Sequence, residues 1–291
     1  MAGEPFDNRE GVIWIDGAFV NWREARVHVL SHALHYASAV FEGERAYNGK
    51  VFKLREHTER LHKSAATLGF QIPYTADEID AITMQLLEKN NLKDAYVRPI
   101  AWRGSEDMGV SAHSKKIHLA IAVWAWPSYF SPEARAKGIS LMISPWARPA
   151  PNTAPTAAKA AGLYMICTLS KNMAEEKGFN DALMLDWRGQ VAEATGANLF
   201  MVKDGKIYTP TPDCFLDGIT RRTVMDLARQ NGIEVIEKAI SLDELSKADE
   251  VFLTGTAAEV TPVGRIDDWT YTPAAITSTL INAYAKLVGS A

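Results

Sequence analysis

The segment most informative about fold and chemistry is residues 155–164, with the sequence Pro155-Thr156-Ala157-Ala158-Lys159-Ala160-Ala161-Gly162-Leu163-Tyr164. Lys159 is its only charged residue. Because small and apolar neighbours disfavour an ammonium ion, we expect the pKa of Lys159 to be lowered. A neutral lysine amine is the nucleophile that Schiff-base chemistry requires. The alternative is a lysine that lays its aliphatic stem along a packed segment and keeps its charge in water.

Two further segments and one arginine are suited to binding an anion. Asp217-Gly218-Ile219-Thr220-Arg221-Arg222 opens a predicted helix, whose free N–H groups and dipole attract an anion, although an ordinary helix cap is the alternative. Gly255-Thr256-Ala257-Ala258 is a second small-residue turn, at the end of a predicted strand. Arg60 supplies a cation. These features fit a phosphorylated ligand.

A carboxylate, Glu193, follows Gly189-Gln190-Val191-Ala192 in the second half of the chain. A carboxylate that faces a pyridine nitrogen keeps it protonated, which makes the ring an electron sink. The alternative is a solvated loop glutamate, since most glutamates are exposed. Lys159, Arg60, Glu193 and the two turns together predict pyridoxal 5′-phosphate as cofactor.

The predicted strand 95–102 carries a candidate substrate face. Its period of two places Tyr96, Arg98, Ile100 and Trp102 on one side. An arginine beside a tyrosine there can hold a substrate carboxylate bidentately. Pro99 indicates an edge strand, where a surface ion pair is the alternative role for Arg98.

Composition narrows the class of protein. The 291 residues are 47% hydrophobic with a net charge of −4 and no long block of like charge, which argues against nucleic-acid or membrane-surface binding. Cys167 and Cys214 are too few for a disulfide framework, and no apolar run reaches about 18 residues, so we expect a cytoplasmic protein. His32 and His35 lack further ligands at suitable spacing, so we expect no metal.

Hairpin and helix signals predict two α+β domains: a smaller one at 1–130, a link at 131–138, and a larger one at 139–291 that carries Lys159. Asp16-Gly17, Asn48-Gly49 and Asp204-Gly205 predict tight turns. Apolar periodicity predicts helices at 55–68, 79–87, 163–177 and 220–229, and strands at 95–102, 117–126, 139–144, 182–185, 198–202 and 250–253.

An ordered set of motifs resembles the branched-chain amino acid aminotransferases of the fold-type-IV pyridoxal-phosphate class. The matching segments are HALHY at 32–36, FEGER at 41–45, REHTERLH at 55–62, YVRP at 96–99, APNT at 150–153, the Lys159 segment, Glu193 with NLF at 198–200, GITR at 218–221 and GTAAE at 255–259. They span nearly the whole chain. The resemblance implies the two-domain α+β fold of that class and transfer of the amino group of leucine, isoleucine or valine to 2-oxoglutarate.

The resemblance also implies roles for individual residues. Lys159 would bind the cofactor covalently and move the proton. The implied cofactor contacts are Arg60, Tyr164, Glu193, Leu216, Gly218, Ile219, Thr220 and Thr256. The implied substrate contacts are Phe41, Trp126 and Tyr164 around an apolar pocket, and the turn of Thr256, Ala257 and Ala258 at the α-carboxylate. Tyr36, Arg98 and Tyr129 would bind the glutamate side chain, and Tyr96, beside Arg98 on its strand face, is a further candidate substrate contact. Family members are homodimers or homohexamers, and a loop from the neighbouring subunit, here Asp107–Val110, would complete the site.

Two departures from the family pattern leave other functions open. Asp217 stands where bacterial members often have proline, and residues 194–198 replace a more usual Gly-Ser-Gly-Glu-Asn run. An (R)-selective amine or D-amino acid aminotransferase would keep Lys159, Glu193 and Arg60 but change the substrate wall. An aminodeoxychorismate lyase would release pyruvate, and a non-catalytic binding protein would leave the cofactor unchanged on addition of leucine.

Overall fold

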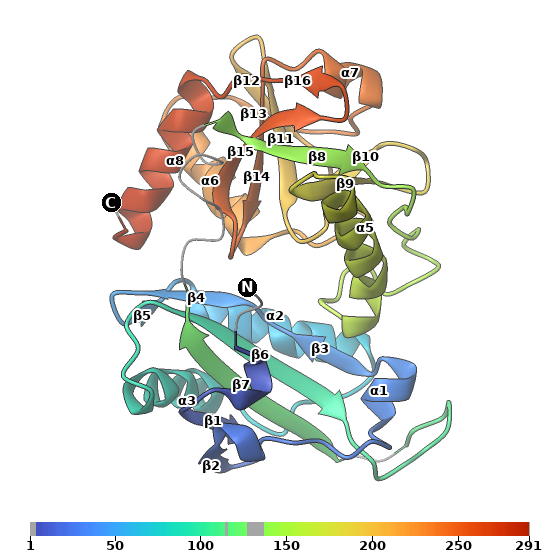
Figure 1. Ribbon diagram of the computed structural model, residues 1–291, viewed down its shortest axis with the longest axis vertical. Helices are drawn as coiled ribbons and strands as arrows, with labels where there is room; N and C mark the ends of the chain where they lie inside the picture. Colours follow the sequence, from blue (N-terminus) through green and yellow to red (C-terminus); the bar gives the residue numbers. More distant parts are fainter. Residues whose placement is uncertain (1–3, 114–115, 127–136, 291) are drawn as a thin grey trace. The chain divides into compact units, whose positions relative to one another are not determined.

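The computed structural model describes residues 4–113, 116–126 and 137–290, and the chain divides into two compact units (Figure 1). Unit 1 comprises Met1–Pro127 and Ala158–Gly162, and unit 2 comprises Ser128–Ala157 and Leu163–Ala291. The predicted link at 131–138 falls largely on residues 127–136, which lie outside the described residues.

Unit 1 is an antiparallel sheet with helices packed on one face (Figure 1). Within the described residues the strand order is β2-β1-β7-β6-β4-β5, and β3 also pairs with β6. The strands are β1 (Val12–Ile15), β2 (Ala18–Asn21), β3 (Ala39–Phe41), β4 (Glu44–Tyr47), β5 (Lys50–Val51), β6 (Ala95–Arg103) and β7 (Ile117–Ala125). The helices are η1 (Phe6–Asn8), η2 (Trp22–Glu24), α1 (His32–Tyr36), α2 (Leu54–Thr67) and α3 (Ala76–Lys89).

The predicted Asp-Gly and Asn-Gly turns are confirmed. Asp16 and Gly17 have φ angles of 47° and 97° between β1 and β2. Asn48 and Gly49, with φ angles of 50° and 78°, join β4 to β5 in the same way. Two successive residues with positive φ match the right-handed twist of the flanking strands, so these dipeptides set the register of both hairpins.

The two long helices of unit 1 follow from their apolar spacing and end signals. Leu61 and Ala65 of α2 are fully buried, one turn apart on the face toward the sheet. Helix α3 begins with a capping box in which Thr75 and Glu78 satisfy each other's backbone N–H groups. Gly69, with a φ angle of 72°, follows α2 and allows the chain to turn away.

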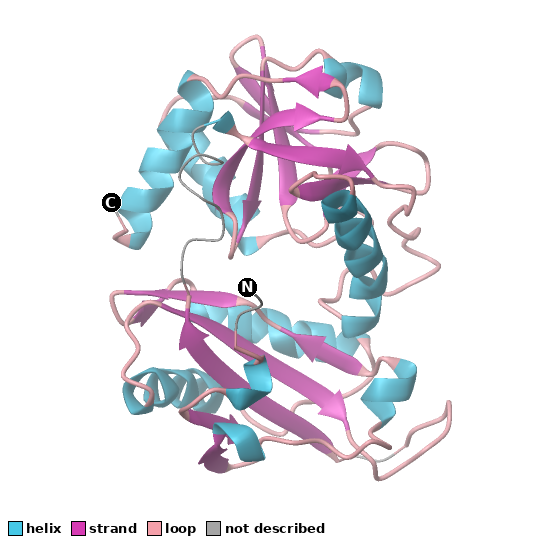
Figure 2. Ribbon diagram, viewed as in Figure 1, coloured by secondary structure: helices cyan, strands magenta, loops and turns pink. Residues whose placement is uncertain are grey.

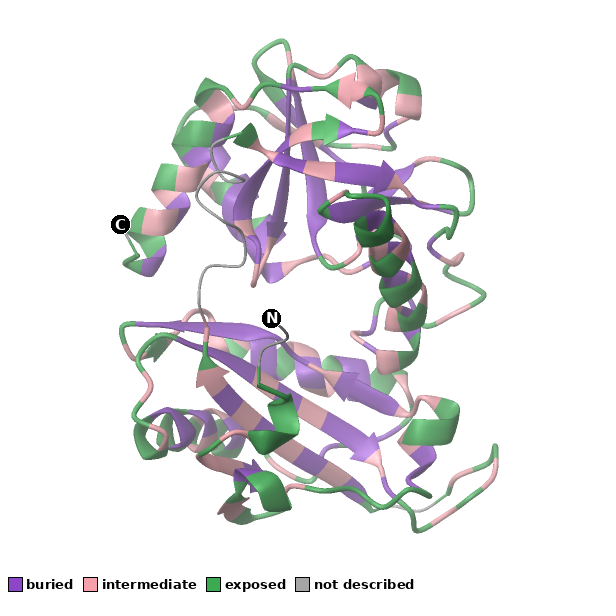
Figure 3. Ribbon diagram, viewed as in Figure 1, coloured by how far each residue is buried: buried purple, intermediate pink, exposed green. Residues whose placement is uncertain are grey.

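Strand β6 lies inside the sheet, so the edge position indicated by Pro99 was wrong. It pairs with β7 along its whole length and with β3 and β4 on its other side. Pro99 falls in the gap between residues 100–102, which pair with β3, and residues 95–97, which pair with β4. The missing N–H of proline therefore costs no ladder hydrogen bond there. Burial alternates along β7 from Ile117 to Trp124 and along β6 from Val97 to Ala101, and Figure 3 shows the purple and pink bands.

The Lys159 segment belongs to unit 1, whereas the sequence placed it in the second domain. The Phe41 N–H donates to the Lys159 carbonyl (3.1 Å), and Val40 forms an antiparallel bridge with Ala160. The Lys159 N–H donates to Ser64 Oγ (3.0 Å) on α2. These three contacts attach the segment alongside β3 and to α2.

Unit 2 contains a mixed sheet, drawn in magenta in Figure 2. Its described strands follow the order β10-β9-β8-β15-β14-β11-β12-β13. A further pairing of β10 with β11 closes β10, β9, β8, β15, β14 and β11 into a barrel. The strands are β8 (Ile139–Ile143), β9 (Asp181–Leu185), β10 (Val191–Ala194), β11 (Asn198–Lys203), β12 (Lys206–Thr209), β13 (Val235–Glu237), β14 (Glu250–Gly255), β15 (Glu259–Ile266) and β16 (Trp269–Thr270).

The helices of unit 2 pack around this barrel. They are η3 (Ala161–Tyr164), which starts in unit 1, α5 (Met165–Glu176), α6 (Ile219–Gln230), α7 (Leu242–Ser246) and α8 (Ala275–Val288). Helices α6 and α8 contact each other, α6 and α8 both contact β14, α8 contacts β15, and α5 contacts β9. Among the described residues, no helix combines the length and apolar character that a membrane span needs.

Candidate active site

Lys159 lies in unit 1 and not in the predicted second domain, but its amine has the desolvated surroundings that the sequence predicted. Burial lowers the pKa of Lys159, the Arg60 and Arg98 cations lower it further, and Glu42 and Tyr96 act in the opposite direction. The Lys159 Nζ atom lies 5.0 Å from the centroid of the Phe41 ring. The lysine amine is therefore shifted toward its neutral, nucleophilic form.

Next to Lys159, Glu42 is bound by two side chains from α2. Arg60 Nε donates to Glu42 Oε1 (2.7 Å), Arg60 Nη2 donates to Oε2 (2.8 Å), and His57 Nδ1 donates to Oε2 (2.7 Å). Burial acts to raise the pKa of Glu42, but the Arg60 cation and these hydrogen bonds outweigh it and hold that pKa well below 4.5. Burial lowers the pKa of His57, so the imidazole donates as a neutral ring. Arg60 is thus oriented by a fixed anion.

On the face of β6 that the sequence predicted to bind substrate, Tyr96 and Arg98 contact each other. Arg98 Nη2 donates to Tyr96 Oη (3.2 Å), and the Arg98 guanidinium lies 5.0 Å from the centroid of the Phe41 ring. The rings of Tyr96 and Trp126 have centroids 4.7 Å apart. Lys159, Phe41, Tyr96, Arg98 and Trp126 therefore line one region of unit 1, with a cation beside aromatic rings.

Gly43 makes room for this arrangement. A Cβ atom at Gly43 would lie 2.0 Å from Tyr96 Oη. Because no side chain fits at that distance, glycine is required for the tyrosine to occupy its place.

Other predicted substrate residues lie elsewhere or outside the described residues. Tyr36, on α1, is 44% exposed and packs against His32, with ring centroids 4.7 Å apart. Tyr129 lies outside the described residues. In the predicted neighbour-completing loop 107–110, the Gly109 carbonyl accepts a hydrogen bond from His32 Nε2 (2.8 Å), while Met108 and Val110 are exposed.

In unit 2, Glu193 lies on β10 with only 12% of its side chain exposed, so the solvated-loop alternative does not hold. Arg148 Nε lies 3.4 Å from Glu193 Oε1. Asn198 Nδ2 donates to Glu193 Oε2 (3.3 Å) and to the Leu216 carbonyl (2.9 Å). Asn198 therefore connects Glu193 to the loop that precedes α6.

The N-terminus of α6 has the features of an anion site. Gly218 is its cap, and within the described part of the chain no side chain caps the first N–H groups. A Cβ atom at Gly218 would lie 2.2 Å from Asn198 Oδ1, so glycine is required there too. The Asp217 carboxylate is bound by Arg221 Nη1 (2.9 Å) and Arg222 Nη1 (3.3 Å), which neutralise it near the helix N-terminus. The open N–H groups of Ile219 and Thr220 are suited to a phosphate.

Two other predicted contacts also lie in unit 2. Tyr164 ends η3 and is close enough to Arg148 to influence its pKa. Residues 256–258 form a turn between β14 and β15, in which the Ala258 carbonyl accepts from Thr261 Oγ1 (2.6 Å). A short turn of small residues leaves its backbone N–H groups accessible to a carboxylate.

The donor set of each unit fits pyridoxal phosphate. Unit 1 offers a buried amine and an oriented arginine, and unit 2 offers a paired carboxylate, a tyrosine and an uncapped helix N-terminus. Residue-by-residue reasoning did not single out Glu42, His57, Arg148 or Asn198. Glu42 interrupts the apolar run Ala39-Val40-Phe41, which is a signal of a buried charge.

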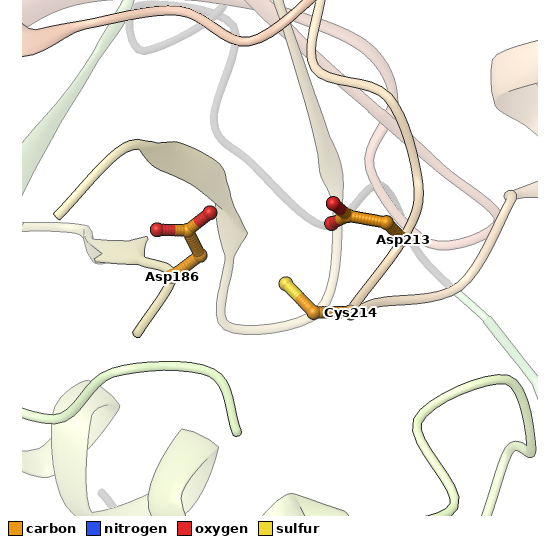
Figure 4. A group of neighbouring side chains, drawn as sticks. All are labelled: Asp186, Asp213 and Cys214. Atoms are coloured by element: carbon orange, nitrogen blue, oxygen red, sulfur yellow. The ribbon is translucent and has the colours of Figure 1, made fainter. Parts of the chain in front are cut away.

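A cluster of possible metal ligands also occurs in unit 2, although the sequence predicted none. Ligand atoms of Asp186, Asp213 and Cys214 lie within 4.8 Å of one another (Figure 4). Arg188 already binds both carboxylates, at 2.6 Å from Asp186 and 2.8 Å from Asp213. Burial raises the pKa of Cys214 to about 12, so its thiol stays protonated. The two carboxylates of this cluster are therefore already paired with an arginine.

Comparison with known proteins shows the family to which the chain belongs. A family model described as Amino-transferase class IV matches residues 39–266. The branched-chain-amino-acid aminotransferase of Pseudomonas aeruginosa is 46% identical over 264 residues, 89% of this chain and 86% of that protein. The branched-chain amino acid aminotransferase structure from Escherichia coli has a TM-score of 0.93 at 41% identity, covering 97% of this chain and 96% of that one. The structure of the T.th. branched-chain amino acid aminotransferase complexed with N-(5′-phosphopyridoxyl)-L-glutamate has a TM-score of 0.92 at 40% identity, and the match covers 97% of this chain and 96% of that one. The chain belongs to the class IV aminotransferase family.

Proposed function

We propose that the chain is a pyridoxal-phosphate-dependent aminotransferase that reversibly moves the amino group of leucine, isoleucine or valine to 2-oxoglutarate. The observation that carries the proposal is the buried, neutral-shifted Lys159 amine beside the Phe41 ring and the Arg98–Tyr96 pair. The named substrates of the similar enzymes, and the phosphopyridoxyl-glutamate bound to one of them, support it.

The residues of unit 1 would handle the proton and the substrate side chain. Lys159 Nζ would take the proton from the substrate α-carbon and deliver it to the carbonyl carbon of the cofactor, which needs the lowered pKa of this amine. Phe41, Tyr96 and Trp126 form an apolar wall for a branched side chain. Arg98, held by the Tyr96 hydroxyl at the rim of that wall, receives the glutamate side-chain carboxylate in the other half-reaction.

The residues of unit 2 would hold the cofactor and the shared α-carboxylate. Bound pyridoxal phosphate supplies an aldehyde carbon that carries the amino group and a ring that withdraws electrons. Glu193 would face the ring nitrogen, Tyr164 the phenolic oxygen, and Leu216 the ring face. The phosphate would bind the 218–220 amides and Thr256, and the substrate α-carboxylate would bind the turn at Ala257 and Ala258.

An (R)-amine or D-amino acid aminotransferase remains the rival function, because it would use the same lysine and glutamate. The Arg98–Tyr96 pair favours the branched-chain function, since a pocket for a simple amine needs no cation at its rim. A panel of amino donors with 2-oxoglutarate, including D-alanine and an (R)-amine, distinguishes the two.

We further propose a homo-oligomer, at least a dimer, in the cytoplasm. Six exposed apolar side chains form a patch on unit 1: Val27, Val29, Leu30, Leu34, Met108 and Val110. Hydrogen bonds from His32 to the Gly104 and Gly109 carbonyls join the two segments that carry them. Such a patch is typical of an interface, and Tyr36, next to it, would reach the site of the neighbouring copy. The free, buried Cys167 and Cys214 fit a reducing compartment.

The test of the function is chemical labelling of the lysine. Borohydride treatment of the holoenzyme followed by peptide mapping should place the reduced cofactor on Lys159. Lys159→Ala should lose all transamination with leucine, while Lys171→Ala, in the same half of the chain, retains it. A label on Lys171 or Lys177 would remove Lys159 from its proposed role.

A further inference from the structure

Arg148 is a buried cation behind the proposed cofactor site of unit 2. It follows β8, its N–H donates to the Leu185 carbonyl (2.8 Å), and its side chain is almost fully buried. A guanidinium in such a place loses its hydration, which costs several kcal/mol unless an anion and hydrogen bonds compensate. The groups around it therefore indicate what it does.

The contacts of Arg148 are long, and one of its donors is unused. Nε lies 3.4 Å from Glu193 Oε1, and Nη1 donates to the Leu163 carbonyl (3.4 Å) and weakly to Cys167 Sγ (3.5 Å). Among the described residues, Nε has no hydrogen-bond partner. Burial lowers the pKa of Arg148, but Glu193 and the smaller contributions of Cys167, Tyr164 and Cys214 together outweigh it and raise that pKa. Arg148 is thus a charged side chain whose main anion is Glu193.

The other oxygen of Glu193 is fixed by the fold. Asn198 Nδ2 donates to Oε2 (3.3 Å), and Asn198 faces Glu193 across the β10–β11 pairing that closes the barrel. The same amide donates to the Leu216 carbonyl (2.9 Å). One oxygen of Glu193 therefore faces a cation and the other faces an amide tied to the loop before α6.

These contacts bear on the position of one proton. Between a carboxylate and a pyridine nitrogen the proton can form an N–H bond, giving an ion pair, or an O–H bond, giving two neutral groups. In a buried site without a further charge the neutral arrangement gains, because desolvation penalises both ions. A cation within about 4 Å of the carboxylate reverses this preference by stabilising the carboxylate anion.

We propose that Arg148 is a positioning residue that keeps Glu193 ionised, so that the shared proton resides on the cofactor ring nitrogen, while Asn198 sets the direction of the carboxylate. The inference rests on the proposed function, because it presumes that Glu193 faces that nitrogen. Arg148 acts through Glu193 and needs no contact with the cofactor or the substrate.

The experiment reads the proton directly. Apoenzyme is reconstituted with pyridoxal phosphate that carries ¹⁵N in its ring, and the ¹⁵N chemical shift is recorded for the native protein and for Arg148→Met, Arg148→Lys and Asn198→Ala. The native shift should be that of a protonated ring. In Arg148→Met it should move toward the value of an unprotonated pyridine nitrogen, and Arg148→Lys should restore much of the protonated signal. Asn198→Ala should move it less, since the cation remains.

A matched control separates this effect from a general loss of packing. Tyr271→Phe removes a buried hydrogen bond of the same unit, from Tyr271 Oη to the Leu245 carbonyl (3.0 Å), and should lower Tm without moving the ¹⁵N signal. A protonated ring in Arg148→Met, with Tm lowered as in the control, would reduce Arg148 to a structural residue. If the methionine variant does not fold, Arg148→Gln, also neutral, is judged by the same shift. A native protein that takes up no pyridoxal phosphate would overturn the proposed function itself.

Discussion

Two buried carboxylates, one in each unit, are paired with arginine in different ways. Glu42 in unit 1 accepts two hydrogen bonds from Arg60, at 2.7 and 2.8 Å, and a third from His57. Glu193 in unit 2 has its arginine at 3.4 Å and the Asn198 amide at 3.3 Å. The first carboxylate has short charge-assisted bonds on both oxygens, whereas the arginine and amide contacts of the second are longer.

The difference separates a structural anion from one suited to a ligand. Three short bonds at Glu42 fix Arg60 and compensate for burial, so this carboxylate has little capacity for another strong donor. At Glu193 the longer contacts with Arg148 and Asn198 keep the charge in place while engaging its lone pairs more weakly. We therefore expect the same replacement, glutamate by glutamine, to affect mainly stability at the first site and mainly catalysis at the second.

Glu42→Gln should have the largest effect. It removes the buried anion that accepts two hydrogen bonds from the partly buried Arg60 cation, so the free energy of unfolding at pH 7 should fall by roughly 3–5 kcal/mol in urea titrations. Because the folded pKa of Glu42 is depressed, its stabilisation is present above about pH 4.5 and is lost as the pH falls through the folded pKa. The difference between variant and native protein should therefore shrink in acid. Arg55→Gln, at an exposed ion pair of the same helix, is the control and should change stability little.

Glu193→Gln should reduce turnover by roughly 100- to 1,000-fold, the scale expected when a fixed electrostatic group is removed from a site. A neutral amide cannot hold a ring nitrogen in its protonated form. Cofactor should still bind, and unfolding should weaken less than in Glu42→Gln. Stopped-flow measurement of the half-reaction with leucine gives the rate, and a near-native rate would show that the two carboxylates do not differ as described.

Arg98→Leu tests a third arginine, whose contacts include the Tyr96 hydroxyl and the Phe41 ring. The half-reactions with glutamate and 2-oxoglutarate should lose about 1.5–3 kcal/mol of transition-state stabilisation, the value of a charge-assisted hydrogen bond. Leucine should lose far less, because its side chain is apolar. Equal losses in both half-reactions would assign Arg98 to the shared α-carboxylate or to the fold.

Glu44→Gln should have the smallest effect, and it should stabilise the protein where the other replacements destabilise it or slow its reaction. Glu44 is fully buried two residues after Glu42, and burial, followed by the nearby Glu42 and Asp80 carboxylates, raises its pKa well above 4.5. Both oxygens lack a hydrogen-bond partner within the described residues. The unfolded chain releases this proton near pH 4.5 and the folded chain keeps it, so native stability falls as the pH rises toward the raised pKa. Between about pH 5 and pH 6 the variant should gain up to about 1.4 kcal/mol relative to the native protein. A constant difference across that range would show that Glu44 ionises normally.

Local signals predicted much of the fold. The dipeptides Asp16-Gly17, Asn48-Gly49 and Asp204-Gly205 each form the expected turn, because successive positive φ angles depend on those residues alone. The helices α2, α3 and α6 lie within a few residues of their predicted ends. The sequence missed β10 as a strand and the barrel it closes, because that closure depends on pairing with two other strands.

The sequence predicted site residues whose role depends on their own sequence neighbours. It missed residues whose role depends on a partner far along the chain. Lys159 could be identified because its small and apolar sequence neighbours indicate a poorly hydrated amine. Arg148 could not, because its partner Glu193 lies 45 positions further along the chain and nothing local to Trp146-Ala147-Arg148-Pro149 indicates burial. Pro99 was misjudged for the same reason, since a gap between two partner strands is invisible in the strand itself.

The space that Gly43 leaves for Tyr96 has a consequence for how this pocket can evolve. Any side chain at position 43 would overlap the Tyr96 hydroxyl, with a Cβ atom 2.0 Å from it and 3.0 Å from the ring carbon that bears it. The two positions are therefore epistatic, because alanine at 43 fits only when position 96 carries a smaller side chain. A smaller side chain at 96 in turn lacks the hydroxyl that accepts the hydrogen bond from Arg98. A mutant library that varies one position at a time would reject both changes. Reshaping the substrate preference at this wall requires the pair to be varied together.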